Sequence, residues 1–406
     1  MSLILLIDLD NTLLENDMEV FIPAYLKSLG EHLANHISPE RLIPALLDAT
    51  QCMLQNNQPD RTLKQVFDAE FYEPLGLDQS AMEKPIAEFY ARRFPALRSL
   101  TKQQPAALGL LQEAAERGYE LVLATNPLFP RTAILQRLNW AGVSLETNPF
   151  QLIPSYETFH FAKPNPAFFA EILGQLGWPQ KPVLMVGDDP YNDIIPAARI
   201  GLPTFWVSNH PPTKVAENFS PSGYGKLADL IDWLHRSEIA DWAPEFTGIQ
   251  AMLAILRSTP AVLLNIADSL LPTLWSESPE SGSWSFTEIL CHLRDVDADV
   301  NLLRIQKILH ESNPFLPGIN TDQWAVERQY YCQNGHQALR DFIGTRLELL
   351  YILDNLKPED WLRSARHAIF GPTHIKELVN IIASHDRLHI RQAMEAREKV
   401  STLTRL

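Results

Sequence analysis

Cysteine is scarce in this sequence, and its three cysteines lie far apart. Cys52, Cys291 and Cys332 form no C-x-x-C pair. This spacing indicates neither a disulfide framework nor a thiolate zinc site, and it is typical of a cytoplasmic protein.

Positive charge is also in short supply. The chain has 34 Lys and Arg against 49 Asp and Glu, which gives a formal net charge of -15. A field of this sign repels phosphate backbones and anionic lipid surfaces at long range. We therefore expect no nucleic-acid partner and no membrane partner.

Long apolar runs are missing as well. No segment approaches the roughly 20 consecutive apolar residues that a membrane helix needs. The opening MSLILLI lacks a basic start and runs directly into Asp8 and Asp10, which argues against a secretion signal.

The remaining composition is that of an ordinary globular protein. Of the 406 residues, 46% are hydrophobic and 20% are charged. At roughly 100 to 200 residues per domain, this length predicts more than one hydrophobic core.

The N-terminal half alternates short apolar runs with helical patterns. Residues 3–7, 120–124, 183–186 and 203–207 are apolar runs, the first three of which end at polar residues. Such runs are typical of buried parallel strands, and their alternation with helices predicts a doubly wound α/β sheet.

Residues 14–100 interrupt this alternation with apolar residues at helical spacing. An insertion directly after the first strand lies over the carboxyl edge of the sheet, where open α/β sheets bind ligands. We expect this segment to form a helical lid, and we place the whole domain at residues 1–240.

The C-terminal half, residues 245–406, has helical patterns and hardly any strand candidates. The patterns cover 248–270, 285–310, 337–355 and 374–397, and Ser285 with Glu288 fits a capping box. Four helices of this length predict an all-α four-helix bundle with a long, aromatic-bearing connection between the second and third helices.

Polar residues recur where the predicted strands end. They are Asp8, Asp10 and Thr12 in DLDNT, Thr125 and Asn126 in LATN, and Asp188 and Asp193 in GDDPYND, joined by Lys163 in AKPNP. Carboxylates, a hydroxyl and an ammonium gathered at one sheet edge suit phosphoryl chemistry with Mg²⁺, which prefers oxygen ligands.

These four motifs, in the chain order DLDNT, LATN, AKPNP and GDDPYND, resemble those of the haloacid dehalogenase (HAD) superfamily. The resemblance implies a Rossmann-like core with a cap, and an aspartyl-phosphate formed on Asp8. It makes Asp10 the general acid and base, and it makes Thr125, Asn126 and Lys163 the phosphate-binding residues. A Mg²⁺ ion is then held by Asp8, Asp10 and Asp188, with Asp193 supporting it from further out.

The resemblance also distinguishes the phosphatases of that superfamily from its dehalogenases. Its dehalogenases lack an aspartate at the position of Asp10, so we expect a phosphatase acting on a small phosphorylated metabolite. A phosphomutase is the alternative. Asp189 could bind metal or cap the following helix.

A second constellation lies near the C-terminus. His385 and His389 stand four residues apart, so a helix presents both on one face, and His292 on the second predicted helix could complete a metal site. His310, His336, His367 and His374 have no such partners. Trp324 and Tyr330 are expected to line the core or a pocket.

Residues from about 245 to 400 resemble the DinB-like metal-binding bundles. The resemblance includes Trp284, the segment TDQWAVERQY, Arg387 and Gln392. It implies Zn²⁺, Ni²⁺ or another divalent ion at the three histidines, with an open position for water or a thiol. The alternatives are a non-catalytic binding module, which would form a homodimer through the bundle, and transfer chemistry coupled to phosphate removal.

Overall fold

The structure is a computed structural model and describes residues 2–147, 150–209, 220–239 and 242–403. Within it the chain divides into two compact units. The first comprises residues 1–172 and 179–245, and the second comprises residues 173–178 and 246–406.

The first unit is built on a parallel sheet of six strands in the order β5-β4-β1-β6-β7-β8. The strands are β1 (Ile4–Ile7), β4 (Glu120–Leu123), β5 (Phe150–Leu152), β6 (Val183–Gly187), β7 (Thr204–Val207) and β8 (Gly223–Gly225). All residues of β1 and β6 are buried, because helices cover both faces of a parallel sheet. The predicted α/β fold class is confirmed.

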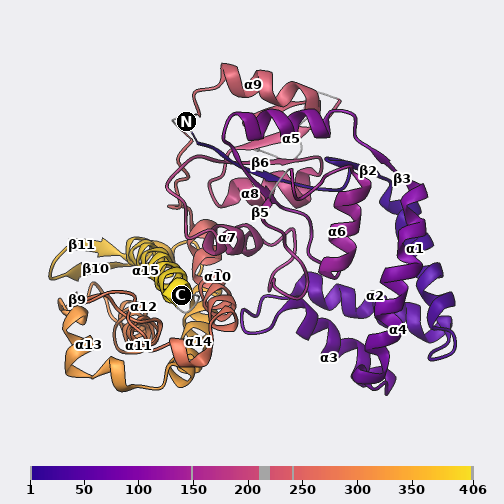
Figure 1. The fold of residues 1–406 in the computed structure, drawn as a ribbon. Helices are drawn as coiled ribbons and strands as arrows, with labels where there is room; N and C mark the ends of the chain where they lie inside the picture. The colour runs from indigo at the N-terminus through magenta and orange to yellow at the C-terminus, as the bar shows by residue number, and fades with distance from the viewer. Residues whose placement is uncertain (1, 148–149, 210–219, 240–241, 404–406) are drawn as a thin grey trace. The chain divides into compact units, whose positions relative to one another are not determined.

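Helices connect these strands on both faces. Figure 1 shows α5 and α9 on one side of the sheet and α7 and α8 on the other. The bounds are α5 (Ala107–Glu116), α6 (Arg131–Trp140), α7 (Pro166–Gln175), α8 (Ile195–Arg199) and α9 (Leu230–Arg236). Leu5 and Ile7 of β1 share one core cluster with buried residues of α5, α6 and α9. This core holds the strand ends in a fixed position.

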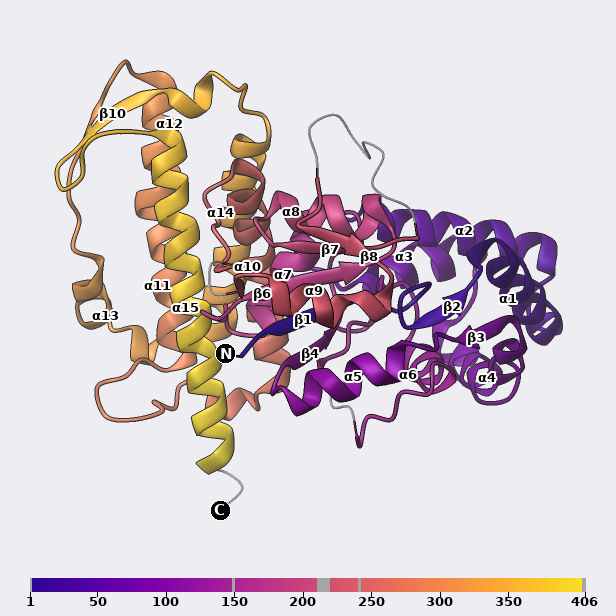
Figure 2. The same cartoon turned by 90° about the horizontal axis from the view of Figure 1, so that it is seen from above.

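Four helices fill the insertion after β1. They are α1 (Met18–Leu33), α2 (Pro39–Gln55), α3 (Leu63–Leu75) and α4 (Gln79–Arg92), and Figure 2 shows them grouped together. The chain enters and leaves through the antiparallel pair β2 (Leu14–Asn16) and β3 (Thr101–Gln103). Asp17 and Asp78 cap α1 and α4, and Thr62 forms a capping box with Gln65 on α3.

The second unit is mostly helical. Its long helices are α10 (Ile249–Ser269), α11 (Phe286–Val296), α12 (Leu302–His310), α14 (Gly335–Asp354) and α15 (Ile375–Leu403). The helix predicted over 285–310 is continued between α11 and α12 by a π-helical turn, Asp297–Asn301. The capping box of Ser285 and Glu288 is present.

The connection between α12 and α14 carries elements that the sequence patterns did not predict. A short helix α13 (Trp324–Glu327) follows β9 (Phe315–Leu316). Strand β9 pairs with β10 (Ser364–His367), which pairs on its other side with β11 (Gly371–His374). The predicted helical bundle is confirmed, and this small sheet is an addition that the sequence patterns did not predict. Strands of two to four residues are too short to show a clear alternating pattern.

We expected no segment long and apolar enough to form a membrane helix, and α10 contradicts this expectation by length and composition. By length and composition alone this helix could cross a membrane, since its most apolar window has a mean hydropathy of 1.4. However, 72% of that window is buried inside the structure. A helix that packs on several sides in a bundle is apolar around most of its circumference.

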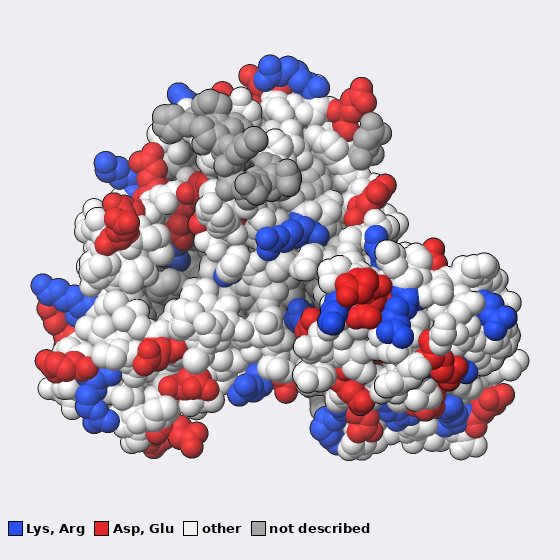
Figure 3. All heavy atoms as spheres, turned by 180° about the vertical axis from the view of Figure 1, so that it is seen from behind, with Lys and Arg blue, Asp and Glu red and all other residues white. Residues whose placement is uncertain are grey.

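Charged side chains of both signs cover the surface. On the face in Figure 3, acidic and basic residues are interspersed. The excess of acidic residues therefore does not form one continuous patch on that face.

A buried ion pair network ties three helical segments of the second unit together. The guanidinium of Arg346 on α14 is fully buried, and its Nε donates to Asp297 at 2.7 Å. It also donates to both carboxylate oxygens of Asp386 on α15 and, over 3.1 Å, to the carbonyl of Leu256 on α10. Burial lowers the pKa of Arg346, but Asp297 and Asp386 outweigh burial and raise it. Arg346 is thus the cation that pairs with two buried carboxylates.

Replacing Arg346 with Met should destabilise the second unit strongly, because it leaves Asp297 and Asp386 buried without a cation. We expect the free energy of unfolding to fall by about 3–5 kcal/mol. Urea unfolding of the full chain, followed by circular dichroism, measures the change. Arg340→Met on the same helix is the matched control, since Arg340 is exposed. Equal stability of the two variants would contradict this account.

Candidate active site and candidate metal centre

Three carboxylates meet at the carboxyl ends of the central strands. Asp8 follows β1, Asp188 follows β6, and Asp193 lies in the helical turn that begins at Pro190. The parallel register aligns Ile7 with Val186, so the chain leaves both strands at the same edge. Carboxylate oxygens of the three aspartates lie within 4.8 Å of one another.

Lys163 lies inside this carboxylate cluster. Its Nζ donates to Oδ1 of Asp8 at 2.7 Å and to Oδ1 of Asp193 at 2.5 Å, and its side chain is 2% exposed. Burial lowers the pKa of Lys163, but the attraction of Asp193 and Asp8 outweighs burial and raises it. Lys163 is therefore an ammonium ion that holds two of the three carboxylates.

One ammonium does not balance three carboxylates. Burial raises the pKa of Asp8 well above its usual range, Lys163 lowers it, and the nearby Asp193, Asp188 and Asp10 raise it. Burial, together with Asp193 and Asp189, raises the pKa of Asp188 to about 7. The cluster lacks positive charge and offers only oxygen ligands, which fits Mg²⁺.

The absence of a side chain at Gly187 leaves room for Asp193 in the carboxylate cluster. A Cβ atom at this position would lie 2.2 Å from Oδ2 of Asp193. Any side chain at residue 187 would therefore displace Asp193 from Lys163. The resemblance had placed Asp193 further out, whereas the structure places its carboxylate in the cluster itself.

Asp10 contacts residues outside the carboxylate cluster. Its Oδ2 forms an ion pair with the buried guanidinium of Arg137 on α6, and its Oδ1 accepts from the side chain of Asn16 at 2.8 Å. Among the described residues, Asp10 is not in the carboxylate group that could hold an ion. The structure thus separates Asp10 from the ligands with which the resemblance had grouped it.

Buried polar atoms near Asp10 lack partners within the described part of the chain. They are Oγ1 of Thr12, Oδ1 of Asn16 and Nε of Arg137. Buried polar groups without protein partners generally bind water or a ligand. Arg137 was missed from the sequence because it lies 127 residues from Asp10 and no local pattern links the two.

Thr125 and Asn126, which follow β4, make different contacts. Thr125 is buried directly after Ala124, whose N–H donates to the carbonyl of Ile7. The amide oxygen of Asn126 accepts from the backbone N–H of Lys163 at 3.1 Å. Asn126 therefore holds the loop of Lys163, which is a positioning contact that the resemblance did not specify.

Asp189 acts as a helix cap. Its Oδ1 accepts from the backbone N–H groups of Tyr191 and Asn192, and its Oδ2 accepts from the Asn192 side chain at 2.6 Å. Of the two roles left open for Asp189, this geometry favours the cap over a metal ligand.

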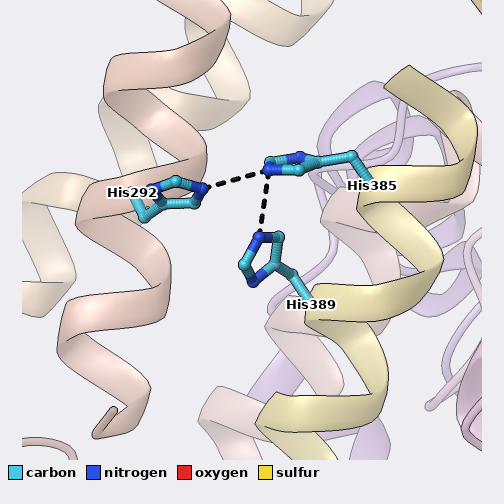
Figure 4. Close-up of side chains that lie close together, drawn as sticks. All are labelled: His292, His385 and His389. Carbon is cyan, nitrogen blue, oxygen red and sulfur yellow. Dashed lines mark hydrogen bonds between the residues drawn. The ribbon is translucent and has the colours of Figure 1, made fainter. Parts of the chain in front are cut away.

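The second unit contains three histidines whose rings converge (Figure 4). His292 projects from α11, and His385 and His389 project from α15. Nε2 of His385 lies 3.0 Å from Nε2 of each of the other two. Their nitrogens are all within 4.8 Å of one another, a spacing that could hold one metal ion.

The surroundings keep these imidazoles neutral. Burial is the largest cause and lowers the pKa of His292 to about 3 and that of His389 to about 4, and it also lowers the pKa of His385 well below its usual range. Nδ1 of His389 contacts Oε1 of Gln392 at 2.8 Å. Since an amide oxygen only accepts, Nδ1 carries the proton, and Nε2 keeps a lone pair for a metal.

Of the other residues behind the DinB resemblance, Trp284 lies beside the histidines, whereas Arg387 has other partners. The ring of Trp284 lies 4.9 Å from His292 and stacks on His389 at 5.9 Å. Tyr330 is fully buried and donates to Asp295 on α11 at 2.8 Å. Arg387 instead packs over the rings of Trp178 and Phe246.

The comparisons with known proteins match each half of the chain separately. Residues 4–201 match the haloacid dehalogenase-like hydrolases, and residues 255–393 match the DinB superfamily. YfiT from Bacillus subtilis, described as a probable metal-dependent hydrolase with an unusual four-helix bundle topology, is a similar solved structure. It is 15% identical with a TM-score of 0.35, and the match covers 39% of this chain and 90% of YfiT.

Two phosphatases are similar to this chain in sequence. A phosphoglycolate phosphatase of Rhodospirillum rubrum is 31% identical over 159 residues, which are 39% of this chain and 63% of that protein. A phosphoserine phosphatase of Thermus thermophilus is 31% identical over 144 residues, which are 36% of this chain and 53% of that protein. The match thus spans less than two thirds of either relative. Residues 4–201 thus match a model of the haloacid dehalogenase-like hydrolases, and residues 255–393 match a model of the DinB superfamily.

Proposed function

We propose that the first unit hydrolyses phosphate monoesters, with Asp8 as the nucleophile. The observation that carries this proposal is the contact of Lys163 with Asp8 and Asp193 beside Asp188 at the sheet edge. The names of the two curated relatives support it, because phosphoglycolate and phosphoserine are both phosphate monoesters.

The reaction proceeds in two displacements. Oδ1 of Asp8 accepts from Lys163, which leaves the other oxygen to attack phosphorus. The bond between phosphorus and the alcohol oxygen breaks, and that oxygen takes a proton from Asp10. Water then attacks the aspartyl-phosphate and gives its proton to Asp10, which restores Asp8 and releases phosphate.

Mg²⁺ is the proposed cofactor of this site. Asp8, Asp188 and Asp193 would hold it, since they form a group of carboxylates with too few cations. When bound, the ion would offset the negative charge of the carboxylates and the phosphoryl oxygens. Lys163 and Thr125 are the proposed partners of the phosphoryl group.

Replacing Asp8 with Asn should abolish turnover while leaving the fold intact, because Asn has the same shape but is not a nucleophile. We expect the rate of phosphate release from p-nitrophenyl phosphate with Mg²⁺ to fall roughly 10³-fold or more. Thermal unfolding serves as the check on folding. Asp60→Asn, an exposed aspartate in the insertion, is the matched control. Turnover within tenfold of the unaltered protein would refute the assignment.

We propose separately that His292, His385 and His389 bind one divalent metal ion such as Zn²⁺ or Ni²⁺. The convergence of three neutral imidazoles supports this, because imidazole nitrogen suits both metals. Gln392 would fix the His389 ring from outside.

Replacing His385 with Ala should remove this metal, because Nε2 of His385 is the nitrogen that contacts both other rings. After chelation and reloading with Zn²⁺, the intact full-length protein should retain about one ion per chain, and the variant should retain about a tenth of that or less. Elemental analysis after gel filtration measures the content. His310→Ala, an exposed histidine on α12, should match the unaltered protein. Equal zinc content in all three proteins would overturn the proposal.

A further inference from the structure

A large cavity lies among the four helices of the insertion. Its volume is about 680 Å³, and it is lined by residues from α1, α2, α3 and α4 together with the segment after β4, residues 128–136, and Tyr156. This volume falls within the usual range for small-molecule binding sites.

The cavity walls are mainly aliphatic and aromatic. Representative lining residues are Leu29, Leu46, Phe67, Phe71, Ile86 and Phe129. Lys64 is the only cation among the described lining residues, and Asp68 pairs with it at 2.5 Å. Tyr25 and Tyr90 bond to each other at 3.0 Å, so their hydroxyls are also partnered. Nothing in this lining offers an unpaired positive charge for the carboxylate of a small acid.

Two chains of contact link this cavity to Asp10. The side chain of Asn16 donates to Asp10 at 2.8 Å and contacts Sδ of Met18, a lining residue, at 3.4 Å. The guanidinium of Arg137 pairs with Asp10 and lies 5.3 Å from the ring centre of Phe129, another lining residue. Asn16 and Arg137 therefore each contact both Asp10 and a residue of the cavity wall.

The proposed reaction places the alcohol part of the substrate on this side. In an in-line displacement the leaving oxygen lies opposite the nucleophile, so the alcohol extends away from Asp8. Asp10 protonates that oxygen and must lie beside it. The rest of the alcohol then extends past Asp10, whose partners Asn16 and Arg137 contact the cavity wall.

We propose that this cavity binds the alcohol part of the substrate, and that the substrate is a phosphate monoester of an apolar alkyl, prenyl or aryl alcohol. This inference rests on the proposed phosphatase function and narrows its substrate class. A second cavity of about 670 Å³ touches Asp188 and is lined by Asn11, Glu15 and Lys226 among others. A small polar alcohol would suit that cavity instead.

A series of alkyl monophosphates from butyl to dodecyl tests the proposal. With Mg²⁺ present, kcat/KM should rise about fourfold for each added methylene until the cavity is filled, because each methylene leaves water for an apolar wall. Thr50 on α2 lines the cavity, and Thr50→Phe should reduce the dodecyl-to-butyl ratio of kcat/KM at least tenfold. Ile86→Phe on α4 is a second variant if the first folds poorly.

Gln51→Phe is the matched control, since Gln51 is the next residue on α2, is exposed and does not line the cavity. It should leave the ratio unchanged. Binding of dodecyl phosphate to the Asp8→Asn protein, measured by calorimetry, should weaken at least tenfold when Thr50→Phe is added. Turnover without chain-length dependence, or a preference for phosphoglycolate and phosphoserine, would overturn this inference and leave the phosphatase function standing. Absence of turnover for every ester would overturn the phosphatase function, and this inference with it.

Discussion

The contact of Lys163 with Asp8 and Asp193 is the interaction on which the first unit's chemistry depends. Three carboxylates within 4.8 Å, of which Asp8 and Asp193 are buried, repel one another, and Lys163 is the cation placed among them. Two further features secure that position: Asn126 holds the Lys163 backbone, and Gly187 leaves room for Asp193. Because one ammonium cannot neutralise all three, the cluster is both rigid and short of positive charge, which is the condition under which a protein binds a divalent cation.

Asp8 and Asp10 stand two residues apart, yet they face different environments. Lys163 holds Asp8 toward the carboxylate cluster, whereas Arg137 and Asn16 hold Asp10 toward the helices of the insertion. A nucleophile and an acid that serve opposite sides of one phosphorus atom need this separation. The first helix of the insertion begins at Met18, which contacts Asn16, one of the residues that hold Asp10.

The fold class was predictable because buried parallel strands and bundle helices leave strong apolar patterns, as in residues 3–7 and 248–270. The polar strand ends were predictable for the same reason, since Asp8 and Asp188 stand directly after such runs. Arg137 and Arg346 were not predictable, because their partners lie 127 and 40 to 49 residues away and ion pairs leave no periodic trace. The strands that were not predicted have two to four residues, and none carries an apolar run of four residues; they are β2, β3, β5, β8, β9, β10 and β11.

The two units would select their ions by different physical means. In the first unit, all candidate ligand atoms are carboxylate oxygens. Burial and mutual repulsion raise the free energy of the cluster when no cation is bound, so a hard cation is favoured for its charge. In the second, burial keeps three imidazoles uncharged, so a cation is favoured for its affinity to nitrogen lone pairs. Mg²⁺ binds imidazole poorly, and a three-histidine site suits Zn²⁺ or Ni²⁺ better than an oxygen cluster does. The donor atoms of the carboxylate cluster therefore suit a hard cation, and those of the three histidines suit a metal with affinity for nitrogen.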